Sequence, residues 1–229
     1  MIDYIVSLPY KLITYLRYRV AVNGFFFRSK LVIDKDNSFE STCEIYSTSI
    51  YCKGSGNSIN IHNKLMHSEI RIEGNNNVLL LEEGGFISHS NILIRANNAH
   101  ITVGKRTDIL SVCIICQGER NYIEIGDDCL FSRDIDIWNS DTHTIFDSDG
   151  NVINYSAPIK IGNHVWIGKH VRILKKVTIG DNSVVGMNSL VSKSVPGNSI
   201  AVGSPANVIK SGINWSKNLH QLTMIDDKR

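Results

Sequence analysis

A six-residue period runs from Ile161 to Pro196, in the consecutive units IGNHVW, IGKHVR, ILKKVT, IGDNSV, VGMNSL and VSKSVP. Every unit begins with Ile or Val, and four of the six have Gly in second place. A fixed period constrains the architecture more strongly than local propensity does. The branched residue points inward from a short strand, and the small residue after it lets the backbone bend. Three strands and three bends close a triangular coil of about 18 residues, and coils stack at roughly 4.8 Å, so the period predicts a parallel β-helix.

Weaker repeats extend this prediction toward the N-terminus. Between about Leu31 and Asp128, segments such as SINIH (58–62) and ILIRANNAHITVG (92–104) alternate apolar and polar residues, as half-buried strands do. Clusters of Asn and Gly separate these segments. Both residues tolerate the left-handed backbone of sharp corners, and stacked asparagines can hydrogen-bond to one another. We therefore expect an all-β domain over residues 31–203 and a short C-terminal tail over 204–229.

Residues 1–30 do not follow the repeat. Their apolar residues, with Ser7 as a cap and Pro9 in the first turn, predict an N-terminal helical segment. Two roles stay open for it. It is either a cap over the open end of the β-helix or an interfacial helix in peripheral contact with a membrane, which its Lys and Arg residues and the aromatic run 25–27 favour. The apolar stretch is too short to span a bilayer, and it lacks the organisation of a cleavable signal.

Composition argues against two classes of function. The 24 basic and 22 acidic residues give a net charge of +2, which does not indicate a nucleic-acid-binding surface. Among the five cysteines, Cys113 and Cys116 form a C-x-x-C, a spacing used in metal and redox sites. They lie in the apolar run ILSVCIICQG with no second ligand pair nearby, so we interpret them as buried thiols of a reduced, cytoplasmic protein and expect no metal.

His143 is the first candidate for chemistry. Ile125, Phe131, Ile137 and His143 lie six residues apart, so the histidine falls where the period calls for an inward Ile or Val. An imidazole buried without a partner is costly, and such a break in pattern is expected at functional sites. Histidine titrates near neutrality and can take a proton from an attacking hydroxyl. The alternative is that His143 simply turns outward.

The stretch 144–158 replaces about one coil without moving the register, because Ile161 lies eighteen residues beyond His143. Its polar content and the Asp149-Gly150 pair predict a loop that projects from the column. A loop after such a histidine is a natural place for a binding wall. Asp141 and Asp147 flank the histidine, and we expect them to orient its ring or to bind the acceptor.

The run NSDTHTIFD, the V-W-I-G unit, the S-K-x-V-P unit and the ending G-S-P-A-x-V-I-K occur in this order over roughly residues 125–210. In this combination the chain resembles the hexapeptide-repeat acetyltransferases, especially the galactoside and maltose O-acetyltransferases and the O-acetyltransferases of capsular polysaccharide and sialic acid. The resemblance implies a left-handed parallel β-helix, acetyl-CoA as acyl donor, and a homotrimer with each site between two neighbouring columns.

The resemblance also assigns roles to individual residues. It makes His143 the catalytic base and places Trp166 at the reaction centre, beside the thioester. The residues that it assigns to acetyl-CoA are Gly168, Lys169 and Met187 along the pantetheine arm, Lys193 near the phosphates, Pro205 on the adenine and Lys210 near the 3′-phosphate. Lys169 and Met187 depart from the Ser and Ala that other members often carry there.

We therefore predict an acetyl-CoA-dependent O-acetyltransferase that acts on a sugar hydroxyl of a surface polysaccharide or its precursor. Transfer is expected to be direct, since no Cys or Ser is placed to form a covalent intermediate. Two alternatives stay open: an N-acetyltransferase of an amino sugar or xenobiotic, and a non-catalytic β-helix scaffold. A zinc enzyme of the carbonic anhydrase type would need three converging histidines, whereas His164 and His170, six residues apart, fall on adjacent faces.

Overall fold

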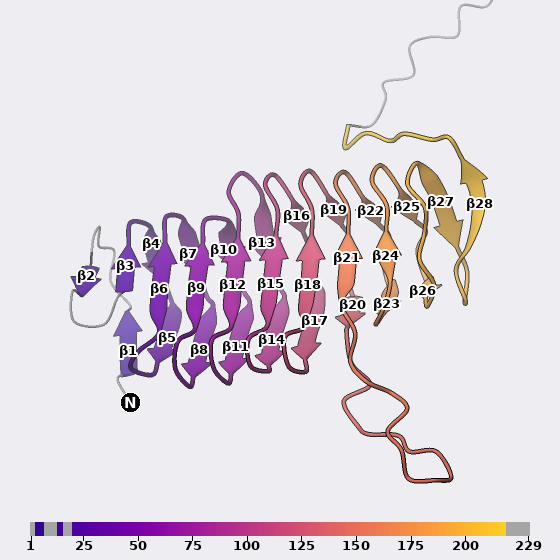
Figure 1. Cartoon of the computed structure of the whole chain (residues 1–229). Coiled ribbons are helices and arrows are strands. Elements are labelled where there is room, and N and C mark those ends of the chain that lie inside the picture. Colours follow the sequence, from indigo (N-terminus) through magenta and orange to yellow (C-terminus); the bar gives the residue numbers. More distant parts are fainter. Residues whose placement is uncertain (1–2, 7–12, 16–19, 219–229) are drawn as a thin grey trace, which may run out of the picture.

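Stacked triangular coils form a long column in the computed structural model, which describes residues 3–6, 13–15 and 20–218 (Figure 1). Successive strands of the chain go to three different sheets, and strands of neighbouring coils pair in parallel along most of the column. None of the described residues is helical. The prediction of an all-β, left-handed parallel β-helix is confirmed.

The strands form three sheets, and neighbours in the strand order of each sheet are hydrogen-bonded to each other. Sheet A contains β1 (Asp3–Val6), β5 (Ser29–Ile33), β8 (Ser49–Lys53), β11 (Glu69–Glu73), β14 (Asn91–Arg95), β17 (Val112–Gln117), β20 (Ile135–Trp138), β23 (Arg172–Leu174) and β26 (Leu190–Val191). Sheet B contains β2 (Ile13–Tyr15), β3 (Val20–Val22), β6 (Ser38–Ser41), β9 (Ser58–Ile61), β12 (Val78–Leu81), β15 (His100–Val103), β18 (Tyr122–Ile125), β21 (Ile159–Ile161) and β24 (Thr178–Ile179). Sheet C contains β28 (Asn207–Ser211), β27 (Ser199–Val202), β25 (Val184–Val185), β22 (Trp166–Ile167), β19 (Leu130–Phe131), β16 (Asp108–Ile109), β13 (Phe86–Ser88), β10 (Lys64–Met66), β7 (Glu44–Tyr46) and β4 (Phe25–Phe27).

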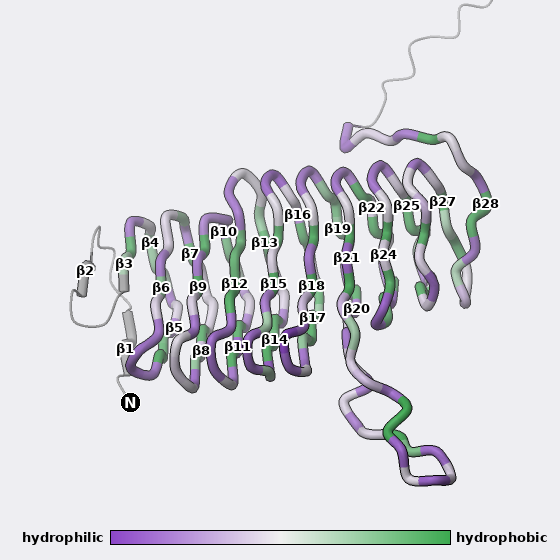
Figure 2. Tube along the Cα trace, viewed as in Figure 1, coloured by the Kyte–Doolittle hydropathy of each residue, from purple (hydrophilic) through white to green (hydrophobic). Residues whose placement is uncertain are grey.

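Inward side chains of successive coils form one continuous apolar core, dominated by Ile and Val. Figure 2 shows hydrophobic residues recurring from coil to coil in the coloured part of the chain. Strand register stacks equivalent residues directly over one another, each fully buried; one such ladder on sheet A is Ile50, Ile70, Ile92, Ile114, Ile137 and Ile173. Burying each of these side chains stabilises the fold by about 1.5–3 kcal/mol relative to exposure.

Asparagines stack at the corners, as predicted. Asn76 and Asn98 both adopt a left-handed backbone (φ of 55°), and the Asn76 amide donates to Asn98 Oδ1 at 3.3 Å. A second asparagine ladder is buried at the same corner, between sheets A and B. The Asn57 amide donates to Asn37 Oδ1 at 2.9 Å, and the Asn77 amide donates to Asn57 Oδ1 at 3.0 Å. Each buried amide is satisfied by its neighbour, which makes polar corners compatible with an apolar core.

The predicted N-terminal helical segment is wrong for the residues that the structure describes. β1 pairs antiparallel with β5, and β2 pairs antiparallel with β3. The sequences DYIV, ITY and VAV are rich in β-branched and aromatic residues, and the strand edges at this end of the column offer unpaired backbone groups to extended chain. Residues 1–2, 7–12 and 16–19 lie outside the described residues, so the cap and the membrane contact stay predictions there. No helix in the described ranges is long and apolar enough to cross a bilayer.

The two cysteines of the C-x-x-C face opposite sides of β17. Cys116 points into the core and is fully buried, whereas Cys113 points outward and is half-buried. Residues three apart on a strand cannot share one face, so these thiols cannot bind one ion together. Burial raises the pKa of the Cys116 thiol to about 12. Within the described chain, no group of three or more His, Cys, Asp or Glu side chains is arranged to bind a metal.

Candidate active site

The chain leaves the column between β20 and β21 and forms a projecting loop, residues 140–156 (Figure 1). Its base is closed by Asn139, whose carbonyl accepts the Ala157 N–H at 3.0 Å. The Asn139 side chain is fully buried and hydrogen-bonds to both backbone groups of Gln117, at 2.8 and 3.1 Å. The chain thus leaves and rejoins the column at one corner, between sheets A and B, which explains why the register is unchanged at Ile159.

His143 lies in the projecting loop and is exposed, so its predicted inward position is wrong. Ile125, Phe131 and Ile137 do point into the core, but the inward period stops where the chain leaves the column. The backbone of His143 is fixed on both sides: its N–H donates to the carbonyl of Asp141 at 2.7 Å, and its own carbonyl accepts the Asn154 amide at 2.7 Å. An accessible imidazole therefore stands on an ordered backbone near the base of the loop.

Asn154 and Lys175 organise the chain around His143, and sequence reasoning missed both. Asn154 also donates to the Asp141 carboxylate at 2.9 Å and accepts the Ile145 N–H at 2.7 Å. Lys175, which follows β23, donates to the same carboxylate and to the Asn154 carbonyl, the latter at 3.1 Å. Its ammonium group holds the pKa of Asp141 below the usual value. The one sequence signal was that Lys175 lies in a repeat unit without the second-place Gly.

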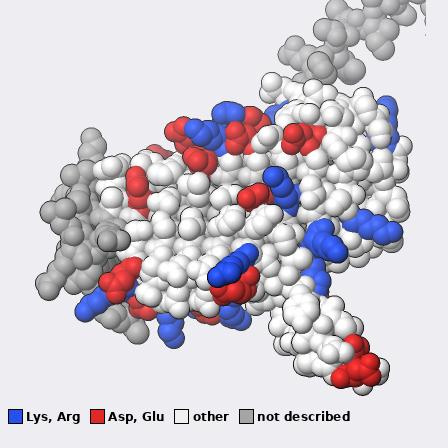
Figure 3. All heavy atoms as spheres, viewed as in Figure 1, with Lys and Arg blue, Asp and Glu red and all other residues white. Residues whose placement is uncertain are grey.

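Asp147 lies at the far end of the loop and closes its tip. Its carboxylate accepts the backbone N–H groups of Asp149 and Asn151, each at 2.9 Å, and the Asn151 side-chain amide at 3.1 Å. The bonds from Asn151, its backbone N–H first, lower the pKa of Asp147. Figure 3 shows the acidic tip as a group of red side chains. None of the described contacts joins Asp141 or Asp147 to the imidazole, so their predicted contact with the acceptor stays a prediction.

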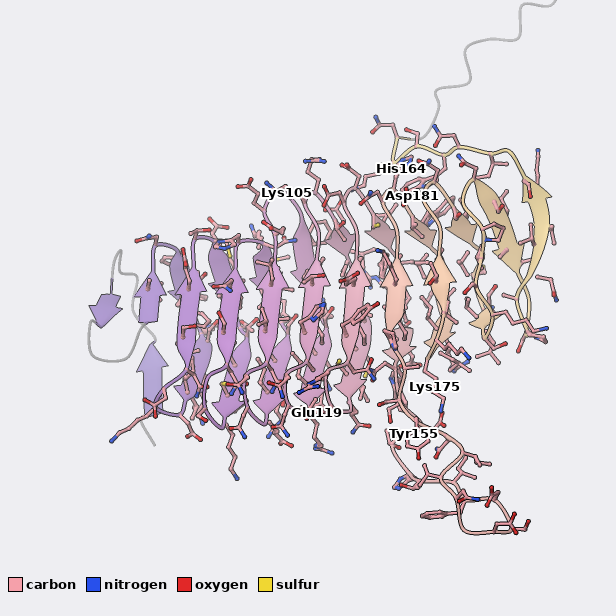
Figure 4. All side chains as sticks on the ribbon, in the orientation of Figure 1. Lys105, Glu119, Tyr155, His164, Lys175 and Asp181 are labelled. Carbon is pink, nitrogen blue, oxygen red and sulfur yellow. The ribbon has the colours of Figure 1, made fainter. Side chains whose placement is uncertain are left out.

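Trp166 lies on the outer face of sheet C, in β22, with 40% of its surface exposed. The projecting loop leaves from the corner between sheets A and B, which is the corner opposite sheet C. One chain therefore keeps Trp166 and His143 apart. Figure 4 shows the two regions of the column: Lys175 and Tyr155 lie where the loop joins it, and His164, close to Trp166 in sequence, lies at another corner.

Three of the residues predicted to contact acetyl-CoA share the corner between sheets C and A. Gly168 and Lys169 follow β22, and Met187 lies one coil beyond, 62% exposed. A Cβ on Gly168 would come within 2.6 Å of the Met187 backbone nitrogen, so the close approach of the coils requires glycine there. The Lys169 ammonium lies 3.6 Å from the Asp134 carboxylate.

The other three predicted contacts are more dispersed. Pro205 lies in the turn between β27 and β28, and the neighbouring Gly203 accepts the Leu190 N–H at 2.9 Å, so this turn continues the corner between sheets C and A. Lys193 is exposed at the corner between sheets A and B, and Lys210 is exposed on β28. The structure brings four of the six residues to one edge of the column and leaves these two lysines elsewhere.

Comparison with known proteins decides the family. The family model described as bacterial transferase hexapeptide (six repeats) matches residues 158–193. A polysialic acid O-acetyltransferase of Neisseria meningitidis is 33% identical over 205 residues, which span 85% of this chain and 92% of that protein. The chain belongs to the hexapeptide-repeat acetyltransferase family. The sequence resemblance and the assignment to acyltransferase enzymes are thereby confirmed.

Other members of the hexapeptide-repeat family agree with this result. A polysialic acid O-acetyltransferase of Escherichia coli O1:K1 is 38% identical over 138 residues, which are 60% of this chain and 45% of that protein, so the match spans less than half of that relative. The solved structure of the polySia-specific acetyltransferase NeuO superposes with a TM-score of 0.67 at 26% identity, covering 92% of this chain and 94% of that one. The polysialic acid O-acetyltransferase OatWY gives 0.62 at 27% identity, covering 90% and 95%.

Proposed function

We propose that this protein is an acetyl-CoA-dependent O-acetyltransferase that acetylates a hydroxyl of a sialic-acid-containing surface polysaccharide or its precursor. The observation that carries the proposal is the match to the Neisseria meningitidis polysialic acid O-acetyltransferase over 92% of that protein. A match of this extent includes the degenerate N-terminal coils as well as the regular repeats. Acetyl-CoA is a cytoplasmic metabolite, so the proposed reaction takes place in the cytoplasm.

Charge near the projecting loop supports an anionic acceptor. Lys176 and Lys193 are exposed at the corner from which the loop leaves, and Figure 3 shows Lys and Arg side chains around the last coils and the base of the loop. Lysines act as point charges toward carboxylates and phosphates. They suit a sialic acid carboxylate or the phosphates of CoA.

The proposed chemistry is a direct transfer. An unprotonated nitrogen of His143 takes the proton from the acceptor hydroxyl as the oxygen attacks the thioester carbonyl. The tetrahedral intermediate then collapses, the C–S bond breaks, and the imidazolium returns the proton to the departing CoA thiolate. Asn154 and Lys175 contribute by fixing the backbone that carries the imidazole. The products are the acetyl ester and free CoA.

A second copy of the chain is needed to complete this site. His143 and Trp166 lie toward opposite sides of one column, so they meet only when the loop of one chain reaches sheet C of another. The projecting loop carries exposed apolar side chains suited to such a contact: Ile145 (51% exposed), Phe146 (58%), Ile153 (59%) and Tyr155 (73%). Exposed apolar groups of this density are typical of protein interfaces. We therefore propose the homotrimer that the sequence resemblance implies.

The direct test is an acetylation assay with the full-length protein. Acetyl-CoA is offered with polysialic acid, with an uncharged polysaccharide and with glucosamine, and both thiol release and product mass are measured. We expect thiol release with polysialic acid and an acetyl group that mild alkali removes, as an ester requires. An alkali-stable acetyl group would show N-acetylation instead, and no acceptor-dependent release with any glycan would overturn the proposal.

His143→Ala tests the base. It is expected to keep acetyl-CoA affinity and to lower kcat by roughly 10²–10⁴, the usual contribution of a general base. His100→Ala, on the outer face of sheet B, is the matched control and should keep kcat. Full activity of His143→Ala would remove the residue from this role.

Mixing variants tests the shared site. His143→Ala and Trp166→Ala are expected to be weakly active alone. Co-assembled at equal amounts, they should regain activity in about a quarter of the sites, because random mixing pairs an intact loop with an intact sheet C at that frequency. A mixture no more active than its components would contradict a site between two chains.

A further inference from the structure

The last described segment, residues 212–218, returns along the outside of the column toward its N-terminal end; we call it the C-terminal strap. It begins after β28 and is held at intervals. The Ile213 N–H donates to the Asn198 carbonyl at 3.0 Å, and the Asn198 amide donates back to Ile213 at 3.2 Å. Further on, the Lys217 ammonium donates to the Arg106 carbonyl at 2.6 Å and to the Asp108 carboxylate at 2.9 Å. The strap therefore crosses several coils along the corner between sheets B and C.

Trp215 is the centre of the strap and is held by two different interactions. Its indole stacks on the His164 imidazole, with centroids 4.3 Å apart and an interplanar angle of 7°. Its Nε1–H donates to the His164 carbonyl at 2.7 Å. The imidazole is fixed in turn by Asn182, whose Oδ1 lies 3.0 Å from His164 Nδ1. Stacking and hydrogen bonding together restrict the orientation of the indole.

The same indole lies beside Trp166. The two ring centroids are 5.9 Å apart at an angle of 40°, within the range of favourable aromatic pairs. Trp166 projects from an open sheet, and its neighbours in register are Leu130 and Val184. Its indole N–H donates to no described residue, so Trp215 supplies the aromatic contact that restricts it.

We infer that Trp215 is a positioning residue, which fixes Trp166 at the acetyl-CoA site from the side of the strap. The inference rests on the proposed function, because the role of Trp166 beside the thioester belongs to that proposal. Binding to a mobile side chain includes the entropic cost of ordering it. Fixing Trp166 beforehand removes this cost from the binding step.

Kinetics and binding give the first test. Trp215→Ala is expected to raise the Kd of acetyl-CoA by roughly 3- to 10-fold, and Trp215→Phe, which keeps a ring for the stack, should stay within about twofold of wild type. Lys217→Ala is the matched control: it loosens the strap at its other attachment and should lower Tm without changing Kd. The inference is overturned if Trp215→Ala matches wild type, if it binds more tightly, or if the Kd of all three variants simply follows their Tm.

A second test needs neither substrate nor activity. The chain has 3 tryptophans, so in a Trp138→Phe background any replacement of Trp215 leaves Trp166 as the sole tryptophan, which is excited at wavelengths that tyrosine does not absorb. Fluorescence anisotropy of Trp166 should be lower with Trp215→Ala than with Trp215→Phe. Trp215→Leu keeps apolar volume without a ring, and it should behave like Ala if the ring is what matters. Equal anisotropy in all three overturns the inference, whereas wild-type protein that binds no acetyl-CoA would overturn the proposed function alone.

Discussion

Replacing Asn154 by Ala should separate the placement of His143 from the stability of the column. The substitution removes three hydrogen bonds: those to Asp141 and to the His143 carbonyl, and the one from the Ile145 N–H. All three lie in an exposed loop where water replaces them in part, so we take about 0.5 kcal/mol each, the low end of the usual range. Their sum of about 1.5 kcal/mol lowers the equilibrium constant between the ordered and the disordered loop base by a factor of roughly ten.

The expected result is a fall of about tenfold in kcat/KM for Asn154→Ala, with Tm unchanged, because the loop joins the column only through one corner. Steady-state kinetics measures the first quantity and thermal unfolding the second. Hydrogen exchange adds a local readout, since the Ile145 amide should exchange faster once its acceptor is gone.

Asn151→Ala is the matched control for this substitution. It is the same residue type in the same loop, and its side-chain amide donates only to the Asp147 carboxylate at the tip. We expect its kcat to stay within about twofold of wild type, because the tip bonds do not touch the His143 backbone. Wild-type kcat/KM in Asn154→Ala, with faster Ile145 exchange demonstrated, would refute the reasoning that loop order positions the imidazole. An equal loss in both variants would refute it as well.

Three further results are expected. Asn77→Ala should lower the free energy of unfolding by about 1–3 kcal/mol in urea titration, because it leaves buried backbone groups unpaired. Asn75→Ala breaks two exposed bonds from Ser55 and should cost less than about 1 kcal/mol, so equal losses would contradict the buried ladder. A thiol reagent should modify at most Cys43 and Cys113 in native protein, since burial shields the other three thiols, and native-state reaction of all five would contradict this. Lys175 holds the pKa of the Asp141 carboxyl below its ordinary value of 3.8. The stability that this ion pair contributes is therefore present above pH 3.8 and is lost as the pH falls through the lower pKa of the folded protein. An NMR titration of Asp141 should find a midpoint below pH 3.8, and a midpoint above pH 3.8 would contradict the ion pair.

Much of the architecture was readable in the sequence because every coil contacts only its neighbours. The repeat at 161–196 places Ile or Val inward every sixth residue, and each inward residue stacks on its equivalent in the next coil. The corner asparagines were also readable, since Asn accepts a left-handed backbone more easily than most residues. Other left-handed corner residues, such as Arg28, His67 and Lys176, carry no such signal in the sequence. The N-terminal segment was misjudged because its apolar residues fit a helix as well as short strands, and only the unpaired edge at the end of the column decides between them.

The candidate site divides in the same way. Motif and period pointed to His143, but the period could not show that the chain leaves the column at Asn139 and carries the histidine outward. The partners around it come from distant positions: Asp141 is 13 residues from Asn154 and 34 from Lys175, and Trp215 is 51 from His164. The sequence alone specified the features that repeat from coil to coil, because each coil stacks its inward apolar residues on the next coil in the same way. The polar contacts of a single loop and a single strap occur once, at separations set by how the chain closes in space, and so only the tertiary structure determined them.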